Sequence, residues 1–217
     1  MKLAIIIPVR DRDYHLQKLL AELKDKITGV DSYSIFVCEQ TQDGKAFNKG
    51  MINNCGFDLC KYDFDLFCFH DVDQLPIEVV DFSKYETPTH VSGKTEQFGW
   101  KVPYKPFLGG VILFSKEHYQ KVNGYSNQYW GWGAEDDDLT LRCKYAELPI
   151  QYWDYPYSSL THEGRNLTNY KGNIERLGKN HFMQDAYKSD GLSSLKYEIQ
   201  SLYVVFNTNI FKTKFKI

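Results

Sequence analysis

LAIIIPVRDRDYHLQKLLAEL, residues 3–23, is the stretch that decides the fold class. Its first part, Leu3–Pro8, is a short apolar run rich in β-branched residues, which is typical of a buried strand. Its second part follows Asp13, which we expect to cap a helix, because leucines then recur at helical spacing, at positions 16, 19, 20 and 23. A strand followed directly by a helix is the first half of a repeating α/β unit.

The same alternation continues after residue 23. We expect a second strand over Tyr33–Cys38, a helix over Ala46–Leu59 and a third strand over Leu66–Phe69. Strand, helix, strand, helix, strand predicts a parallel sheet covered by helices on both faces. In such sheets ligands bind beyond the carboxyl ends of the strands, so the residues that follow each strand are the first candidates for a functional site.

The second half of the chain extends the α/β pattern. We expect a strand over Gly109–Phe114, a helix over Lys116–Val122, a helix beginning at Glu135 and a strand over Ile150–Trp153. The stretch Asp154–Asn173 is polar and lacks periodicity, so we expect a loop that acts as a mobile lid over the site. Nothing marks a second domain, and we expect residues 1–217 to form a single catalytic domain.

Composition and charge argue against several classes of protein. The formal net charge of -2 offers no electrostatic case for nucleic acid as the partner. The five cysteines include no CxxC pair, which favours reduced core thiols over a structural zinc site. The apolar run at the start is too short for a signal peptide or a membrane span, so we expect a cytoplasmic protein. The sequence leaves the oligomeric state open.

An Asp-Val-Asp motif, Asp71–Asp73, follows the third predicted strand. Because side chains alternate along a strand, we expect both carboxylates to point the same way at its carboxyl end. Paired carboxylate oxygens suit a hard divalent cation that bridges the phosphates of a nucleotide. The alternative is an acidic turn in solvent, but the position of the motif after a buried strand favours the metal site.

WGWGAEDDD, residues 130–138, is the most informative stretch for function. Acidic residues in the first turn of a helix are stabilised by the helix dipole, by roughly 0.3–1 kcal/mol each. Four consecutive carboxylates exceed that need, because they repel one another. Two tryptophans between glycines indicate a ring presented on a shaped loop. We therefore interpret the stretch as a platform for a sugar with a general base beside it.

Four more residues are candidates that allow two interpretations each. Arg10 and Arg12 leave the first strand at the same sheet edge, where they suit a phosphate or, equally, a neighbouring aspartate. Phe47 is either a ring that stacks on a base or a core residue. His162 lies in the polar stretch and is either a metal ligand or a solvated side chain.

In order and spacing, these motifs resemble the animal β-1,4-galactosyltransferase family (glycosyltransferase family 7), over Ala4–Tyr197. Several ordered motifs are much more specific than any one of them. The resemblance rests on residues 7–12, 47–48, 71–73, 107–111, 130–138 and 190–192. The secretory anchor of the family is absent from the sequence, so we expect a bare catalytic domain like that of a bacterial cytoplasmic enzyme.

The resemblance implies a GT-A (Rossmann-like) nucleotide-sugar glycosyltransferase fold. It also implies an inverting transfer of galactose from UDP-galactose to a saccharide or glycan hydroxyl, with Mn²⁺ or, as an alternative, Mg²⁺. The donor site that it implies consists of Pro8, Arg10, Arg12, Phe47, Asp71, Asp73, Phe107, Gly110 and Trp132. Gly110 would let the backbone approach the sugars closely.

The resemblance also implies roles around the reacting groups. Asp73 and His162 would bind the metal. Asp136 would be the general base, and Glu135 would help to hold the sugars. The acceptor would contact Trp132, Asp136 and Asp137.

Two alternatives stay open. Phe107 stands where the family usually has Tyr, beside the carbon-2 substituent of the transferred sugar, so the donor is either UDP-galactose or UDP-N-acetylgalactosamine. The second alternative is a catalytically inactive sugar-binding protein, against which the joint presence of the metal-binding and acidic motifs speaks. The identity of the acceptor is not determined by the sequence.

Overall fold

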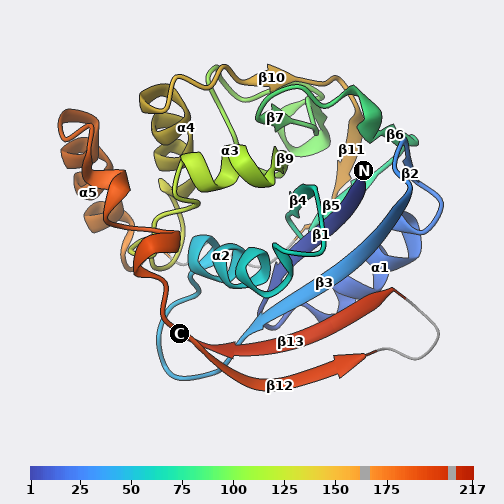
Figure 1. Cartoon of the computed structure of the whole chain (residues 1–217), viewed down its shortest axis with the longest axis horizontal. Helices are drawn as coiled ribbons and strands as arrows, with labels where there is room; N and C mark the ends of the chain where they lie inside the picture. The colour runs from blue at the N-terminus through green and yellow to red at the C-terminus, as the bar shows by residue number, and fades with distance from the viewer. Residues whose placement is uncertain (162–166, 205–208) are drawn as a thin grey trace.

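The computed structural model describes residues 1–161, 167–204 and 209–217. Its largest sheet runs through the middle of the molecule (Figure 1), and its strands lie in the order β10-β7-β9-β4-β1-β3-β13-β12. In chain order, these strands are β1 (Lys2–Val9), β3 (Ser32–Gln40), β4 (Leu66–His70), β7 (Thr89–His90), β9 (Val111–Ser115), β10 (Gln151–Tyr152), β12 (Glu198–Val204) and β13 (Ile210–Lys216). β1 pairs in parallel with β3 on one side and with β4 on the other.

The two faces of β1 carry the two layers of helices. Because alternate residues point to opposite faces, Ile6 belongs to one core cluster with residues of α2 (Lys49–Cys60), and Ile5 to the other with leucines of α1 (Asp13–Leu23). Residues 3–7 are completely buried, and each buried Leu or Ile side chain contributes about 1.5–3 kcal/mol. α1 and α2 accordingly lie on opposite faces of the sheet (Figure 1).

The sheet is mixed rather than parallel. β9 runs antiparallel to both of its neighbours, β4 and β7, and β12 runs antiparallel to β13. The prediction of a parallel sheet is therefore confirmed for β1, β3 and β4 and wrong for β9, whereas β13 at the other side pairs in parallel with β3. A parallel connection needs a crossover, usually a helix. The chain between β4 and β9 instead contains short strands, turns and single 3₁₀ turns.

Shorter strands pair outside the main sheet. Three form a second sheet, in the order β5 (Gln74–Pro76), β11 (Pro156–Ser159) and β8 (Lys94–Thr95). A separate pair consists of β2 (Ile27–Thr28) and β6 (Val80–Asp81). β5 begins at Gln74, directly after residues 71–73, which follow β4. The second sheet therefore lies directly beside that segment.

The stretch Asp154–Asn173 is more ordered than its composition predicts. It contains β11, which pairs with β5 and β8, and the first residues of α5 (Tyr170–Phe182). The expectation of an irregular loop is wrong for these parts, because Tyr157 is buried and ties β11 to the core. Residues 162–166 lie outside the described residues, and the lid stays a prediction.

The starts of the first two helices differ from the prediction. Asp13 is the first residue of α1 rather than its cap, and the preceding residue makes no capping hydrogen bond. α2 begins at Lys49, because the side chain of Asn48 caps it by accepting a hydrogen bond from the backbone N–H of Met51 at 2.9 Å. The other helices are α3 (Lys116–Lys121) and α4 (Glu135–Tyr145). None of the helices in the described part of the chain is long and apolar enough to span a bilayer.

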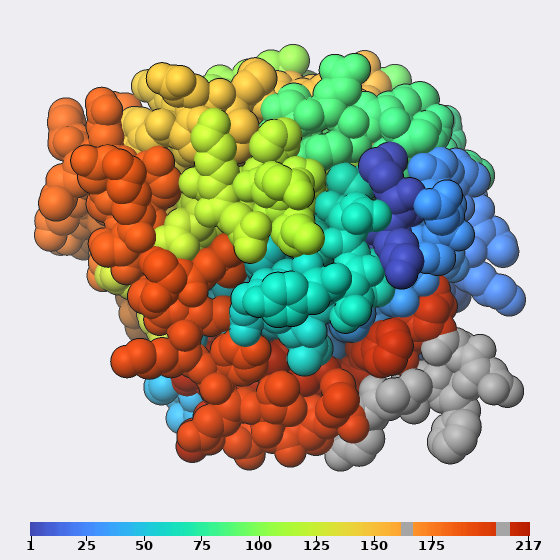
Figure 2. Space-filling model, viewed as in Figure 1, coloured from blue at the N-terminus to red at the C-terminus, as the bar shows by residue number. Residues whose placement is uncertain are grey.

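The fourth carboxylate of the acidic run is part of the core. Asp138 is buried and accepts hydrogen bonds from Arg142 Nε at 2.6 Å, from the Tyr129 hydroxyl at 3.0 Å and from the Asn180 amide at 2.7 Å. Arg142, also buried, donates to the backbone carbonyl of Asp190 at 2.7 Å. The hydrogen bond from Asn180 to Asp138 joins α5 to α4, and α5 lies beside α4 at one edge of the face seen in Figure 2.

Because Asp138 is buried and paired with Arg142, we expect Asp138→Asn to lower the stability of the protein strongly. In the described part of the chain, the substitution removes the nearer of the two carboxylates that face the buried Arg142 guanidinium and leaves only Asp190, at 3.5 Å. Breaking a buried pair costs about 3–5 kcal/mol. We expect a fall of that size in the free energy of unfolding, measured by denaturant titration. Asp185→Asn is the matched control, because its ion pair with Lys188 is exposed and contributes less than about 1 kcal/mol. Equal losses in the two variants would contradict the structural role of Asp138.

Candidate active site

A cavity of about 750 Å³ opens at the carboxyl ends of β1 and β4. The segments that follow these strands line it, together with the N-terminal turns of α2 and α4. Among its lining residues are Pro8, Arg10, Arg12, Phe47, Asp71, Asp73, Phe107, Gly110, Trp132, Glu135, Asp136 and Asp137. These are all the predicted site residues within the described part of the chain; His162 lies outside it. The predicted roles of these residues remain predictions.

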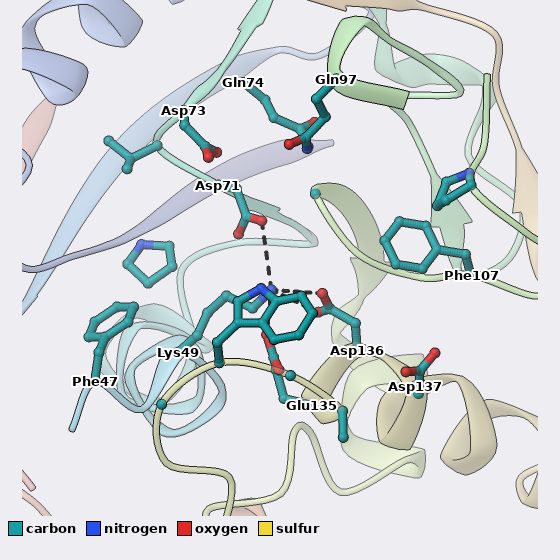
Figure 3. A pocket seen from close by; sticks show the side chains of 18 of the residues that line it. Phe47, Lys49, Asp71, Asp73, Gln74, Gln97, Phe107, Glu135, Asp136 and Asp137 are labelled. Carbon is teal, nitrogen blue, oxygen red and sulfur yellow. Dashed lines mark hydrogen bonds and ion pairs between the residues drawn. The ribbon is translucent and has the colours of Figure 1, made fainter. Parts of the chain in front are cut away.

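Asp71 and Asp73 stand in a turn and not in the strand. β4 ends at His70, and the backbone N–H of Gln74 donates to the carbonyl of Asp71 at 3.2 Å, which closes the turn. Val72, between the two aspartates, is buried in the core. Both carboxylates therefore line the cavity (Figure 3), as expected, but through the geometry of a turn rather than through alternation along a strand.

Lys49 lies at the centre of the site and is not among the predicted residues. Its ammonium nitrogen is 2.8 Å from a carboxylate oxygen of Asp136, 3.1 Å from one of Glu135 and 3.7 Å from one of Asp71. Figure 3 shows these three carboxylates around it. Burial lowers the pKa of Lys49, but the carboxylates outweigh burial and hold the pKa well above its usual value. The lysine is therefore a permanent cation in the site.

The sequence does carry a signal for this lysine. Lys49 is the first residue of α2, directly after the Asn48 cap. A cation in the first turn of a helix is disfavoured by the helix dipole. A lysine at this position therefore indicates that anions from elsewhere in the fold lie near it, and the acidic run at the start of α4 supplies them.

Two of the three carboxylates around Lys49 hold their protons more tightly than ordinary carboxyl groups do. Burial raises the pKa of Asp136 to about 8 and that of Asp71 to about 6. Lys49 opposes both shifts, and the neighbouring carboxylate of Glu135 adds to both. One lysine among three carboxylates leaves an excess of negative charge. The site is therefore suited to take up a proton or a cation.

The acidic run divides between the cavity and the core. Glu135 and Asp136 face Lys49, whereas Asp137 accepts a hydrogen bond from the Tyr104 hydroxyl at 2.5 Å. Asp138 turns away into the core, as described above. Three of the four carboxylates thus line the cavity, and the fourth explains part of the apparent excess of acid at the start of α4.

The loop before α4 presents Trp132 to the cavity. Gly131 and Ala134 adopt positive φ angles of 76° and 75°, a conformation that costs a residue with a Cβ about 1–2 kcal/mol. Trp132 is 39% exposed, and its ring centre lies 5.4 Å from that of Tyr170 in α5. The prediction of an aromatic ring on a shaped loop is confirmed, and the strained Ala134 marks the point where the loop becomes the helix.

Phe47 and Arg10 lie together at one side of the cavity. The guanidinium carbon of Arg10 is 5.5 Å from the ring centre of Phe47, and Arg10 donates a hydrogen bond to the backbone carbonyl of Lys45 at 2.9 Å. Phe47 packs partly against the core and also lines the cavity. The core interpretation of Phe47 therefore holds, and the same ring remains available to a ligand.

Phe107 lies across the cavity from Phe47 (Figure 3). Its ring centre is 5.2 Å from that of Tyr104 and 5.5 Å from that of His90. Next to it, a Cβ on Gly109 would lie 2.5 Å from a carboxylate oxygen of Asp136. The Phe107–Gly109 segment and the start of α4 are therefore packed as closely as backbone and side chain allow.

Asp71 and Asp73 are the described residues best suited to hold a divalent cation. Carboxylate oxygens are hard ligands, which Mg²⁺ and Mn²⁺ prefer. Within residues 1–161, 167–204 and 209–217, no group of three or more His, Cys, Asp or Glu side chains is arranged to hold a metal ion. Two carboxylates fit a cation whose remaining ligands are water and the phosphates of a nucleotide.

Two protein-family models match adjacent parts of this chain. Residues 1–87 match the family model described as the N-terminal region of glycosyl transferase group 7, and residues 89–164 match the N-terminal domain of galactosyltransferase. The chain is 36% identical over 213 residues to β-1,4-galactosyltransferase 4 of Cricetulus griseus and 34% identical over 206 residues to human β-1,4-galactosyltransferase 1. These matches cover 93% and 91% of this chain but 60% and 51% of the relatives.

Solved structures show the same architecture. The catalytic domain of Drosophila β1,4-galactosyltransferase 7, in complex with xylobiose, matches with a TM-score of 0.83 and 28% identity, over 100% of this chain and 94% of that one. A mutant of the Drosophila enzyme, in complex with manganese, UDP-Gal and xylobiose, matches with a TM-score of 0.75 and 25% identity over the same shares. The chain belongs to the β-1,4-galactosyltransferase family and has the GT-A glycosyltransferase fold.

Proposed function

We propose that this chain transfers galactose from UDP-galactose to a saccharide hydroxyl, with inversion at the anomeric carbon and with Mn²⁺ or Mg²⁺. The observation that carries the proposal is the meeting of the Asp71–Asp73 turn and the Glu135–Asp136 helix start in one cavity. The names of the relatives support galactosyl transfer. The Drosophila complex with manganese, UDP-Gal and xylobiose supports this donor, this metal and a saccharide acceptor.

The donor occupies the side of the cavity beyond β1 and β4. Asp71 and Asp73 hold the divalent cation, which supplies positive charge against the diphosphate of the leaving UDP when it is bound. Arg10 and Arg12 line the same side and suit phosphate oxygens. Phe47 offers an aromatic face to the uracil.

Asp136 is the general base of the proposed reaction. The acceptor oxygen attacks the anomeric carbon, the bond from that carbon to the UDP oxygen breaks, and its electron pair leaves with UDP. The hydroxyl proton passes to Asp136, whose raised pKa of about 8 suits a base that works near neutral pH. Lys49 contacts both oxygens of this carboxylate, at 2.8 and 2.9 Å, and so fixes its orientation.

The acceptor lies on the side of the cavity formed by the start of α4 and its preceding loop. The exposed ring of Trp132 suits the C–H face of a pyranose. Asp137, at the rim, is an acceptor for sugar hydroxyls in the place of its present partner, the Tyr104 hydroxyl.

Release of UDP from UDP-galactose in the presence of Mn²⁺ and simple saccharide acceptors tests the proposal. We expect release that stops on chelation of the metal and that Asp73→Ala abolishes, because the variant loses one of two hard-oxygen ligands. Since Asp71 and Asp73 offer only oxygen, we expect Mg²⁺ to support a substantial share of the activity. Asp63→Ala, at an exposed aspartate outside the cavity, is the control. Donor binding without UDP release would identify a sugar-binding protein, and full activity in chelator would contradict the metal dependence.

The third prediction concerns the base. Asp136→Asn should lower kcat by about 10²–10⁴-fold and leave the affinity for UDP nearly unchanged, because this side chain serves the acceptor. Only the deprotonated carboxylate is active, so kcat/KM should fall as the pH decreases through the pKa of Asp136, well above the ordinary value of 3.8. Rate measurements across pH, with and without the substitution, check both points. Near-normal turnover of Asp136→Asn would remove Asp136 from this role.

The fourth prediction concerns the donor. We expect UDP-galactose to be preferred over UDP-N-acetylgalactosamine, because the Phe107 ring restricts the space for an acetamido group. Steric discrimination of this kind amounts to about 10–200-fold. Phe107→Leu should raise kcat/KM for the N-acetylgalactosamine donor relative to galactose, whereas Phe107→Tyr, which keeps the bulk, should not. If the unmodified enzyme already favours UDP-N-acetylgalactosamine, that sugar is the natural donor.

A further inference from the structure

Gln74 places a buried amide at the cavity that none of the roles above uses. Its residue is 2% exposed, and its Oε1 atom has no hydrogen-bond partner among the described residues. Six buried side-chain polar atoms in the described part of the chain share that property, on Thr41, Asn53, His70, Gln74, His90 and Thr213. Gln74 is the one among them that lines the cavity.

The amide is held in place by the fold. Gln74 is the first residue of β5, which pairs with Ser159 of β11, and its backbone N–H closes the Asp71 turn. Its side chain lies against Gly110, whose φ is +75°; a Cβ there would be 2.5 Å from the amide nitrogen and 2.9 Å from the amide oxygen. Gly110 therefore makes room for this amide, and the predicted close approach of sugars to the Gly110 backbone stays a prediction.

A purely structural role does not account for a glutamine at this position. A buried carbonyl oxygen without a hydrogen bond costs free energy, whereas a leucine or methionine would fill similar space without that cost. Nearly all buried polar groups in proteins are hydrogen-bonded, so an exception at a ligand cavity points to a partner that arrives with the ligand.

The position of Gln74 indicates which part of the ligand it meets. Gln74 directly follows Asp73, which is proposed to bind the metal, and its side chain contacts Gly110. The residue before Gly110 is Gly109, against which the Asp136 carboxylate packs. In the proposed reaction, the transferred sugar lies between the diphosphate at the metal and the base. Gln74 lines the cavity in which this sugar would lie, and Figure 3 shows it beside Asp73.

The chemistry of an amide narrows the partner further. Phosphate oxygens only accept hydrogen bonds and so cannot satisfy Oε1, which needs a donor. A sugar hydroxyl both donates and accepts, and two adjacent hydroxyls match the oxygen and nitrogen of one planar amide. We propose that Gln74 is a specificity-determining residue that binds hydroxyl groups of the transferred sugar through its side-chain amide. This inference rests on the proposed function.

Gln74→Leu tests the inference through binding, without turnover. The affinities for UDP and for UDP-galactose are measured by calorimetry in the presence of Mn²⁺. We expect the affinity for UDP to stay within about twofold and that for UDP-galactose to fall by about 3–10-fold, the loss of one or two neutral hydrogen bonds. We also expect the melting temperature of the free protein to rise by about 2–4 °C, because the unsatisfied buried oxygen is gone.

Thr213→Val is the matched control. Its hydroxyl is also buried without a hydrogen bond, but it lies in β13 and does not line the cavity. The change should likewise raise the melting temperature and leave both affinities unaltered. A set of UDP-deoxygalactoses then identifies the hydroxyl. To the unmodified protein, one of these deoxy donors should bind more weakly than UDP-galactose. To Gln74→Leu, the same deoxy donor and UDP-galactose should bind with equal affinity, as a double-mutant cycle requires for a direct contact.

Three outcomes would overturn the inference while leaving the proposed function intact. These are equal losses of affinity for UDP and UDP-galactose in Gln74→Leu, no loss for either, and a lower melting temperature with unchanged sugar affinity. If the unmodified protein binds no UDP-sugar at all, the proposed function fails and the inference with it, so the two failures are distinguishable.

Discussion

The ammonium group of Lys49 lies between carboxylates that come from two distant segments of the chain, Asp71 after β4 and the Glu135–Asp136 pair at the start of α4. Removing these charges from water is costly, and one lysine balances only part of the negative charge of three carboxylates. Burial, together with the repulsion between the carboxylates, raises the pKa of Asp71 and of Asp136. In the proposed function, a cation bound by Asp71 and a proton taken up by Asp136 would each relieve this excess of negative charge.

Two closely packed helices carry most of these charges: Lys49 begins α2, and Glu135 and Asp136 begin α4. α2 packs so closely on the sheet that a Cβ on Gly56 would lie 2.6 Å from a methyl group of Ile6 in β1. α4 is fixed to the core by the buried Arg142, which donates hydrogen bonds to the backbone carbonyls of Gly124 and Asp190. Both helices therefore direct their N-terminal turns at the cavity, and the charges they carry are positioned by the core rather than by mobile loops.

Three locally unfavourable features of the structure lie at the cavity. Lys49 opposes the dipole of the helix that carries it, Ala134 holds a left-handed backbone conformation, and Gln74 buries an unsatisfied oxygen. Each is destabilising in the free protein, and each belongs to a residue that lines the cavity. Such local conflicts are expected at functional sites, where binding of the ligand offsets their cost.

The sequence by itself determined the α/β class, the central strands and the set of motifs that meet at one sheet edge, because hydrophobic periodicity and residue spacing are local properties. The tertiary structure decided the direction of β9, the departure of Asp138 into the core, and the central place of Lys49. It also decided the burial of the Gln74 amide against Gly110. None of these follows from a linear pattern, because strand direction, burial and charge pairing depend on which side chains from distant segments pack together.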